Sequence, residues 1–510
     1  MNEQKEHGWG LPLLVLVSGM FMAVLDTSIV NVAVATIGAD FGATTDEVAW
    51  IVTAFTLTLG VVVPLSAWLA ERFGPARVYA AALLGFGITS ALCGFAWNLE
   101  SLIAFRVLQA IPGGILPPLS MAMLYRIVPP PKIGQAMGMY GMGIIVAPAI
   151  GPTLGGYLVE YIDWRWIFFI NVPVSIVATS AALTILPKFA PSGRTRFDTL
   201  GFAAIATGFF ALLLALSEGE SWGWTSFPVV ALGCLSMVAL AIFVVWELEI
   251  DHPLLDLRVF RSWEYVNSLM IISVLSIGMF TVLFYIPVFL QVAQGLGAFE
   301  AGFVLLPQAL IMAVMMPLAG RIYDRIGPRW PALVGLAICT WGTFLLHDMT
   351  PDTPRHTIAL VLMFRAAGMG LAMMPIMTGG LAAVPAALVP SGSAFNNVVQ
   401  RVSAGLGLAI LGAILSTANA QFLADRAGLT ADGTPIPSLG PGETGQMLGG
   451  YVAYTRIANE AFVDALDNVM IITTVVTAVG LVLALFLRTG AKDHSLDGEN
   501  AGAGPAMAVD

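Results

Sequence analysis

Hydrophobic residues occur along the chain in runs of about twenty, separated by short stretches that contain Gly, Pro or charged residues. An α-helix of about 20 residues crosses the roughly 30 Å of hydrocarbon in a bilayer and satisfies its own backbone hydrogen bonds there. The pattern therefore predicts an all-α integral membrane protein. Its fourteen predicted transmembrane helices lie near residues 11–34, 48–70, 78–97, 101–125, 134–158, 166–186, 198–216, 228–246, 267–290, 301–322, 331–347, 357–378, 394–418 and 469–487.

Composition supports a membrane location. Hydrophobic residues make up 58% of the 510 residues and charged residues only 11%, whereas soluble domains contain about 25% charged residues. Cys93, Cys234 and Cys339 lie in three different apolar runs without the spacing of metal ligands or redox pairs, and we expect them to be packing residues. The net charge of −10 is expected to lie mostly in solvated loops and the C-terminal tail, and no nucleic-acid partner is predicted.

The basic residues predict how the helices are oriented. An even number of crossings puts both termini on one side of the membrane, and Lys and Arg are enriched in cytoplasmic loops. One set of loops holds Lys5, Arg72, Arg77, Arg126, Lys132, Lys188, Arg194, Arg196, Arg258, Arg261, Arg321, Arg325, Arg329, Arg488 and Lys492. The opposite set holds Arg165, Arg355, Arg426 and Arg456. We therefore expect a multi-pass protein of the cell (inner or plasma) membrane with both termini in the cytoplasm and the polar stretch 421–467 outside.

Two segments recur at matching places in the chain. Pro64 to Pro75 reads PLSAWLAERFGP, Pro317 to Pro328 reads PLAGRIYDRIGP, and each follows the second helix of a six-helix block. Phe105-Arg106 likewise corresponds to Phe364-Arg365 in the fourth helix of each block. Equal offsets at two points indicate duplicated halves, as in many transporters. The expected domains are an N-terminal bundle at 1–190, a two-helix linker insert at 191–258, a C-terminal bundle at 259–490 and a disordered cytoplasmic tail at 491–510.

Five motifs together resemble a known family. Leu25 to Ala33 is similar to a first-helix signature, and Ala67 to Gly74 matches a loop motif, with Ala67 and Glu71 where the family has Gly and Asp. Arg106 to Ala110 resembles a fourth-helix motif, Gly143 to Gly156 resembles the antiporter motif, and Trp164 to Pro173 completes the set. From about residue 10 to 490 the chain resembles the fourteen-helix drug-proton antiporters of the major facilitator superfamily, the EmrB/QacA-like branch.

The resemblance implies a proton-coupled multidrug efflux antiporter that exports lipophilic small molecules, cationic ones included, by alternating access. Protons would be the coupling ion and no cofactor is expected. The expected partners are the lipid bilayer, amphipathic small molecules and, as with some similar proteins, a periplasmic adaptor protein. An exporter of one specific metabolite, lipid or antibiotic is the main alternative. A membrane enzyme is the remote one, because the sequence lacks GxSxG, HExxH and GxxxxGK[ST] motifs.

Asp26 and Arg106 are the candidates for proton coupling. Asp26 lies about 22 Å along its predicted span, where an ionised side chain costs about 2.5 to 3.5 kcal/mol on insertion scales and usually faces a polar pathway. A carboxyl group surrounded by hydrocarbon is favoured in its protonated form, and a nearby cation opposes this. The family implies a coupling role for Arg106. The alternatives are a structural Asp26 bonded to Thr27 or Asn31, and an Arg106 that extends towards the outer headgroups.

Two further groups are predicted to control conformation. At two cytoplasmic helix ends an acidic and a basic residue precede a glycine, and ion pairs made by the charged residues can favour the inward-facing or the outward-facing state. The residues of these two groups are Glu71, Arg72, Gly74, Asp324, Arg325 and Gly327. The family's antiporter motif lies on the fifth helix, where small residues permit close backbone approach and prolines permit a bend; its residues here are Gly143, Pro148, Gly151, Pro152, Gly155 and Gly156.

A substrate cavity is expected between the halves near the membrane midplane. Aromatic and Met side chains adapt to varied apolar ligands, and amides add polar contacts. The candidate walls are Asn31, Trp50, Phe55, Met139, Tyr140, Met142, Phe280, Phe284, Tyr285, Asn396, Asn397 and Gln400. Arg365 and Arg401 lie inside spans of the second half, and they either line this cavity or hold helices together.

Overall fold

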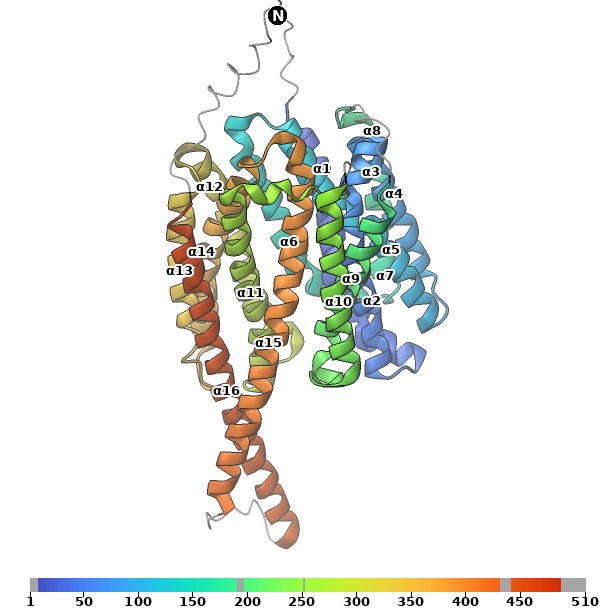
Figure 1. Ribbon diagram of the computed structural model, residues 1–510. Coiled ribbons are helices and arrows are strands. Elements are labelled where there is room, and N and C mark those ends of the chain that lie inside the picture. Colours follow the sequence, from blue (N-terminus) through green and yellow to red (C-terminus); the bar gives the residue numbers. More distant parts are fainter. Residues whose placement is uncertain (1–7, 190–196, 251–252, 432–441, 488–510) are drawn as a thin grey trace, which may run out of the picture.

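Every regular element is a helix within residues 8–189, 197–250, 253–431 and 442–487, which the computed structural model describes. Figure 1 shows the helices side by side in a bundle, with the start of α1 at one end. In chain order they are α1 (Gly10–Phe41), α2 (Thr45–Val62), α3 (Leu65–Phe73), α4 (Pro75–Gly94), α5 (Leu99–Ile127), η1 (Pro130–Lys132), α6 (Ile133–Tyr161), α7 (Trp166–Phe169), α8 (Asn171–Ile185), α9 (Thr199–Trp222), α10 (Phe227–Glu249), η2 (Leu257–Arg261), α11 (Trp263–Val292), α12 (Ala298–Ile326), α13 (Arg329–Phe344), α14 (Arg355–Ala382), η3 (Ala386–Leu388), α15 (Val389–Ala431) and α16 (Gly442–Ala484). The predicted tail at 491–510 lies outside the described residues, as do 191–196 and 251–252 of the predicted insert.

The helices confirm an all-α membrane protein. In the described part of the chain, twelve helical segments are long and apolar enough to cross a membrane, and α2 with α3 makes a thirteenth that bends by 55°. The bend falls at Pro64, whose missing N–H interrupts the helical hydrogen bonds. The predicted span 331–347 corresponds to α13, which has 16 residues. The count of fourteen is reached only if this short helix also crosses.

Helices α1 to α8, here called the first half, pack mainly on one another, and so do α11 to α16, the second half. In the first half α1 contacts α6, α5 and α8, and α4 contacts α5 and α8. In the second half α12 packs on α14, α13 on α14 and α16, and α11 on α15 and α16. The pair α9 and α10 pack on each other, and α9 contacts both α2 and α15. The pair therefore touches the first half and the second half at once.

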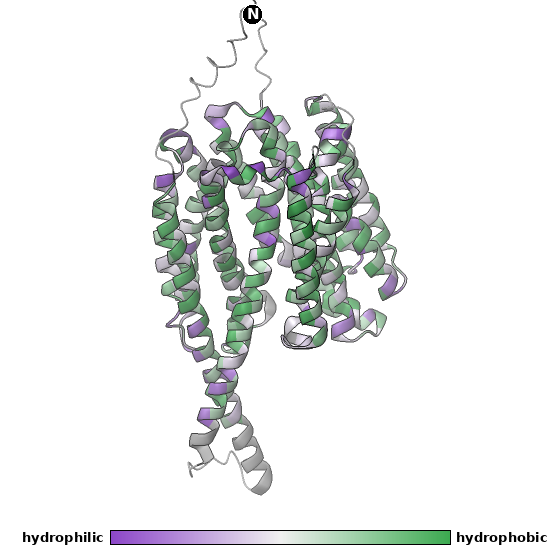
Figure 2. Ribbon diagram, in the orientation of Figure 1, coloured by the Kyte–Doolittle hydropathy of each residue, from purple (hydrophilic) through white to green (hydrophobic). Residues whose placement is uncertain are grey.

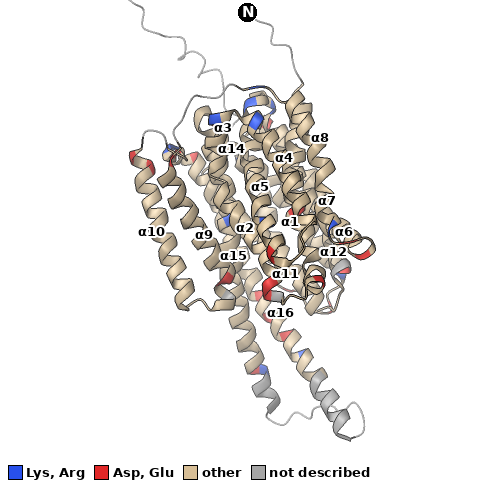
Figure 3. Cartoon of the chain, turned by 90° about the vertical axis from the view of Figure 1, so that its right-hand side faces the viewer, with Lys and Arg blue, Asp and Glu red and all other residues tan. Residues whose placement is uncertain are grey.

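Polar residues lie mainly at the ends of the helices. Figure 2 shows hydrophobic residues along most of the length of the bundle, and Figure 3 shows that Lys, Arg, Asp and Glu gather at its two ends. This distribution is the one that a hydrocarbon slab requires, because a charge near the bilayer centre is costly. The few charged residues in the middle of the bundle therefore need a physical explanation.

Helices α15 and α16 are much longer than a membrane crossing. Each has 43 residues, which corresponds to about 64 Å at 1.5 Å per residue. Figure 1 shows both projecting beyond the bundle at the end away from the start of α1. Arg426 of α15 bonds Glu460 and Asp464 of α16, with N–O distances of 3.0 and 2.5 Å. The described parts of the polar stretch 421–467 thus continue the two helices, which the hydrophobic pattern does not predict.

Candidate functional site

A buried ion pair lies in the middle of the first half. Asp26 of α1 is 0% exposed and Arg106 of α5 is 1% exposed, and Arg106 Nη1 lies 2.5 Å from Asp26 Oδ2. Gln109 and Asn171 each donate from their side-chain amides to Asp26 Oδ1, both at 3.0 Å. Arg106 Nη1 also donates to Gln109 Oε1 at 2.8 Å. The carboxylate therefore has donors from α5 and α8 around it.

The surroundings enclose the guanidinium. The ring of Phe55 on α2 lies 3.7 Å from the Arg106 Cζ atom, and that of Phe168 on α7 lies 5.7 Å away. Arg106 Nε donates to the carbonyl oxygen of Ile51 at 3.4 Å. Arg106 therefore does not extend to the outer headgroups, and Asp26 is bonded to Arg106, Gln109 and Asn171 instead of Thr27 or Asn31.

The ion pair joins α1 to α5. An ionised Asp26 holds Arg106 through a short ion pair, and removing one partner of a buried pair leaves an uncompensated charge. A proton on Asp26 would remove that charge and weaken the hold of α1 on α5. The contact between α1 and α5 therefore depends on the charge of the Asp26 carboxylate.

The second half contains a buried arginine that pairs with no carboxylate among the described residues. Arg365 of α14 is 4% exposed; its Nε donates to Thr343 Oγ1 at 3.0 Å, and its Nη2 donates to the carbonyl oxygen of Gly278 at 2.6 Å. Arg401 of α15 has no hydrogen bond or ion pair with any residue that the structure describes. The buried charges of the two halves are therefore unequal.

Hydrogen bonds join the two halves at the end of the bundle where α1 begins. Asp324 of α12 accepts from the backbone N–H groups of Gly134 and Gln135 at 2.8 and 2.9 Å. These amides belong to the first turn of α6, whose free N–H groups and positive dipole end favour an anion. Two further hydrogen bonds join the halves. The Tyr125 hydroxyl of α5 donates to Thr378 O, and the Ser393 hydroxyl of α15 donates to Pro118 O, both at 2.9 Å. Asp324 thus joins the halves through a helix N-terminus, where ion pairs were predicted.

Close backbone packing accompanies these bonds. A Cβ atom added to Gly138 of α6 would lie 2.7 Å from the Cα of Pro317 on α12, and one added to Gly320 would collide with the carbonyl group of Gly134. Only glycine permits helices to cross at this distance. The first and second halves are therefore closed against each other at the end where α1 begins.

Asp324→Asn is expected to loosen this closure. One carboxylate oxygen becomes an amide NH₂ that cannot accept from a backbone N–H, and a hydrogen bond to a charged group contributes about 1.5 to 3 kcal/mol. The population closed at this end should fall about tenfold or more relative to the open one. Distances between spin labels at Lys132 and Trp330 would measure it. Glu264→Gln, an acidic residue of α11 that bonds nearby Ser262, is the control, and an equal shift in both variants would contradict the assignment.

The segment from Gly143 to Gly156 on α6 lies against α1. Cβ atoms added to Gly143 and Gly155 would come within 2.7 Å of Val17 Cγ1 and 2.8 Å of Ile29 Cγ1, and one on Gly151 would collide with Ser28. Ser28 Oγ donates to the carbonyl oxygen of Pro148 at 3.2 Å. A Cβ on Gly156 would meet nothing within 4 Å, and Pro152 is exposed. The segment is a close helix interface, and its role in antiport stays a prediction.

The predicted cavity residues are distributed over several places. Phe55 lies on Arg106, Tyr140 is bonded to Ser120, and Trp50 packs beside Leu57 and the α9 residues Leu213 and Leu214. Exposed positions among them are Asn31, Met139, Met142 and Phe284. The remaining predicted residues are the half-buried Phe280, Asn397 and Gln400 and the buried Tyr285 and Asn396. Their role in substrate binding stays a prediction.

Two residues of the pair's surroundings were missed from the sequence. Gln109 follows Arg106 by three positions on α5, so both side chains lie on one helix face. Asn171 lies within the Trp164 to Pro173 motif and begins α8. A polar residue on the same face as a buried arginine was the available signal for Gln109. Asn171 offered only its position in a motif, because 145 residues separate it from Asp26.

Comparison with known proteins agrees with this architecture. The model of the Major Facilitator Superfamily matches residues 16–408. The multidrug resistance protein B homolog of Mycobacterium tuberculosis is 33% identical over 79% of this chain and 75% of its own length, and the fatty acid resistance protein FarB of Neisseria gonorrhoeae is 31% identical over 77% and 78%. The solved proton:xylose symporter XylE has a TM-score of 0.60 at 12% identity, over 94% of this chain and 96% of its own, and shows the fold.

The family match, together with a bundle of membrane-spanning helices, identifies a membrane transporter. The chain belongs to the major facilitator superfamily. Transport, rather than an enzymatic reaction, is therefore its activity.

Proposed function

We propose that this transporter exports lipophilic small molecules in exchange for protons, with Asp26 as the proton-binding group. The buried Asp26–Arg106 pair is the observation that carries the proposal, since it is a titratable group placed between helices that must move. The 33% identity to a multidrug resistance protein homolog supports drug-like substrates. Its location would be the cell membrane, with both termini in the cytoplasm.

The contacts between the halves support a cycle of alternating access. With the N terminus in the cytoplasm, the bonds of Asp324, Tyr125 and Ser393 close the cytoplasmic end. A proton that enters from outside and binds Asp26 weakens its pair with Arg106, and the change in packing favours the opposite state. The proton then leaves to the cytoplasm and substrate binds there. Each cycle exchanges inward proton movement for outward substrate movement.

Reconstituted liposomes test this proposal directly. The full chain would be placed in vesicles with an imposed proton gradient, and transport of a fluorescent lipophilic cation would be followed together with internal pH. Coupled export predicts dye movement only with the gradient, and proton movement that increases when dye is added. Dye transport at the same rate with and without the gradient would exclude antiport. Proton movement that does not change when dye is added would exclude this class of substrate.

A second candidate is export of acidic amphiphiles such as fatty acids. The charged residues more than two positions inside a predicted span are Asp26, Arg106, Arg365 and Arg401, so cations outnumber carboxylates. Asp26 is already paired, which leaves a net positive interior that favours an anion over a cation. The 31% identity to the fatty acid resistance protein FarB agrees with this substrate class.

Arg401 is the residue best placed to bind such an anion. Ser393, Asn397, Gln400 and Arg401 share one face of α15 by their spacing, and Ser393 of this face contacts Pro118 of the first half. The neighbouring Asn396 is 1% exposed, with neither amide atom bonded to any described residue. Unsatisfied buried polar groups are costly and are expected to meet a polar ligand.

Arg401→Gln is therefore expected to reduce transport of a long-chain fatty acid about tenfold or more, since a charge-assisted hydrogen bond contributes about 1.5 to 3 kcal/mol. Transport of a lipophilic cation should be retained or increased. Uptake of both compounds into inverted vesicles measures the effect. Arg401→Lys, which keeps the charge, is the matched control. Equal losses for both compounds in Arg401→Gln would rule out an anion site.

A further inference from the structure

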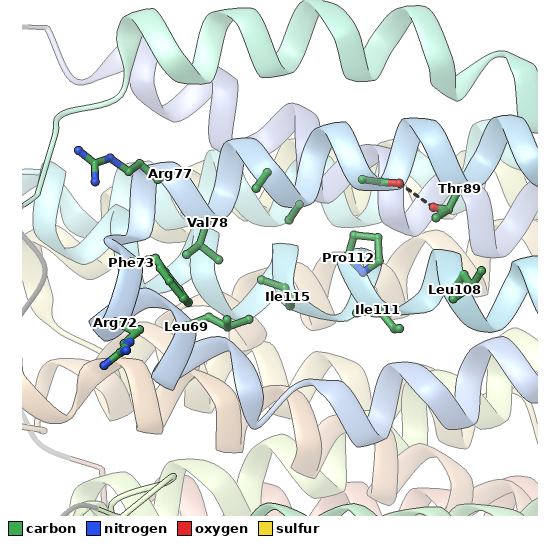
Figure 4. Close-up of a pocket in the computed structure, with 13 residues that line it drawn as sticks. Leu69, Arg72, Phe73, Arg77, Val78, Thr89, Leu108, Ile111, Pro112 and Ile115 are labelled. Atoms are coloured by element: carbon green, nitrogen blue, oxygen red, sulfur yellow. Dashed lines mark hydrogen bonds between the residues drawn. The ribbon is translucent and has the colours of Figure 1, made fainter. Parts of the chain in front are cut away.

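A groove lies on the surface of the first half that faces the lipid, separate from the Asp26–Arg106 pair. It has a volume of about 650 Å³ and is formed by α3, α4 and α5. Figure 4 shows Leu69 and Phe73 of α3, Val78 of α4, and Ile111 and Ile115 of α5 along it. Among the lining residues, Phe73 is 50% exposed and Ile111 is 39% exposed. In a membrane protein these apolar side chains face the bilayer.

The charge in the groove lies at one end. Arg72 and Arg77 are its charged lining residues, and Figure 4 shows both at the end opposite Leu108 and Thr89. Neither arginine forms a hydrogen bond or ion pair with a residue that the structure describes. Glu71, the residue before Arg72, lines a different pocket together with Arg126. At the other end the Thr89 hydroxyl donates to Gly85 O at 2.7 Å and is satisfied.

The groove has the length of one bilayer leaflet. Arg77 and Thr89 are separated by twelve positions on α4, which corresponds to about 18 Å of helix. Half of a hydrocarbon core of about 30 Å is about 15 Å. The arginines lie where α3 ends and α4 begins, at the same end of the bundle as the Asp324 contacts. They are therefore at the level of the headgroups of the leaflet at that end.

We propose that this groove binds one anionic phospholipid of that leaflet. Its phosphate lies between Arg72 and Arg77, and an acyl chain follows the apolar lining towards Leu108. Basic pockets between transmembrane helices on the cytoplasmic side favour anionic headgroups. Arg72 and Arg77, which have no partner among the described residues, supply the complementary charge. A zwitterionic lipid brings its own cation next to the arginines and is held less tightly.

The proposal is tested by lipid retention in the purified full chain. Native mass spectrometry would compare phosphatidylglycerol and phosphatidylcholine of identical chains at equal concentrations. Preference for phosphatidylglycerol is expected in the wild type, and Arg77→Gln should reduce its retention about fivefold, as one arginine near the surface contributes about that factor. Ala81→Phe, which fills the groove from an exposed position of α4, should reduce retention of both lipids.

A matched control separates this site from general charge attraction. Arg261→Gln removes an exposed arginine of η2 outside the groove lining and should leave retention unchanged. The proposal is overturned if the wild type retains both lipids equally, if Arg261→Gln has the same effect as Arg77→Gln, or if Ala81→Phe changes nothing. Displacement of the lipid by a lipophilic dye, without any preference between the two lipids, would instead assign the groove to substrate.

Discussion

Asp26→Asn is expected to abolish proton-driven transport while substrate binding persists. Asparagine has nearly the same shape and keeps an oxygen for the Gln109 and Asn171 amides, but it cannot release or bind a proton at this position. Gradient-driven dye movement in liposomes should fall to the level of empty vesicles. Exchange of dye between the two sides without a gradient should continue, because it needs only the conformational change.

A matched control exists on the same helix. Asp40 lies near the other end of α1, is half exposed, and contacts Arg165 at 3.4 Å. Asp40→Asn should leave coupling intact, because an exposed ion pair contributes little. Retained coupling in Asp26→Asn would place the proton site elsewhere, and loss of dye exchange in that variant would show that it fails for structural reasons.

Arg106→Gln is expected to destabilise the first half by about 3 to 5 kcal/mol, because removing one partner leaves Asp26 buried without its counter-ion. The packing of the Phe55 ring on the guanidinium is lost as well. Thermal unfolding of the purified protein in detergent would show this as a large fall in Tm.

The double variant Asp26→Asn with Arg106→Gln decides the cause of that effect. Two neutral amides can bond each other and Gln109, so the double variant should be more stable than Arg106→Gln alone. A non-additive gain of this kind identifies direct coupling between the two side chains. Simple addition of two losses would show that each residue acts through its own packing, and that the ion pair contributes nothing.

Much of the architecture was predictable from the sequence because hydrocarbon imposes a strict length and polarity on each crossing. The long runs at 11–34 and 267–290 correspond to α1 and α11, and Asp26 and Arg106 were identified as isolated charges in such runs. Their mutual contact was not predictable from spacing, since 80 residues separate them. The family resemblance implied their joint role, and the structure supplies the distance.

Other features could not be predicted from the hydrophobic pattern. The outer parts of α15 and α16 carry too many polar residues to read as crossings, and nothing in their pattern fixes how they pair. The partner of Asp324 was also missed, because backbone N–H groups leave no trace in the residue types. The tight crossing at Gly138 and Gly320 depends on two helices from different halves, which no local pattern can bring together.

The long helices α15 and α16 of the second half offer labelling positions outside the bilayer from which conformational change could be followed. About 30 Å of each 64 Å helix is needed to cross the hydrocarbon, so a comparable length stands clear of it as a rigid arm tied by Arg426. Under the proposed alternating access, the arm moves together with the rest of the second half. With one fluorescent dye on the arm and a second on α9, the efficiency of energy transfer between the dyes should change during each transport cycle.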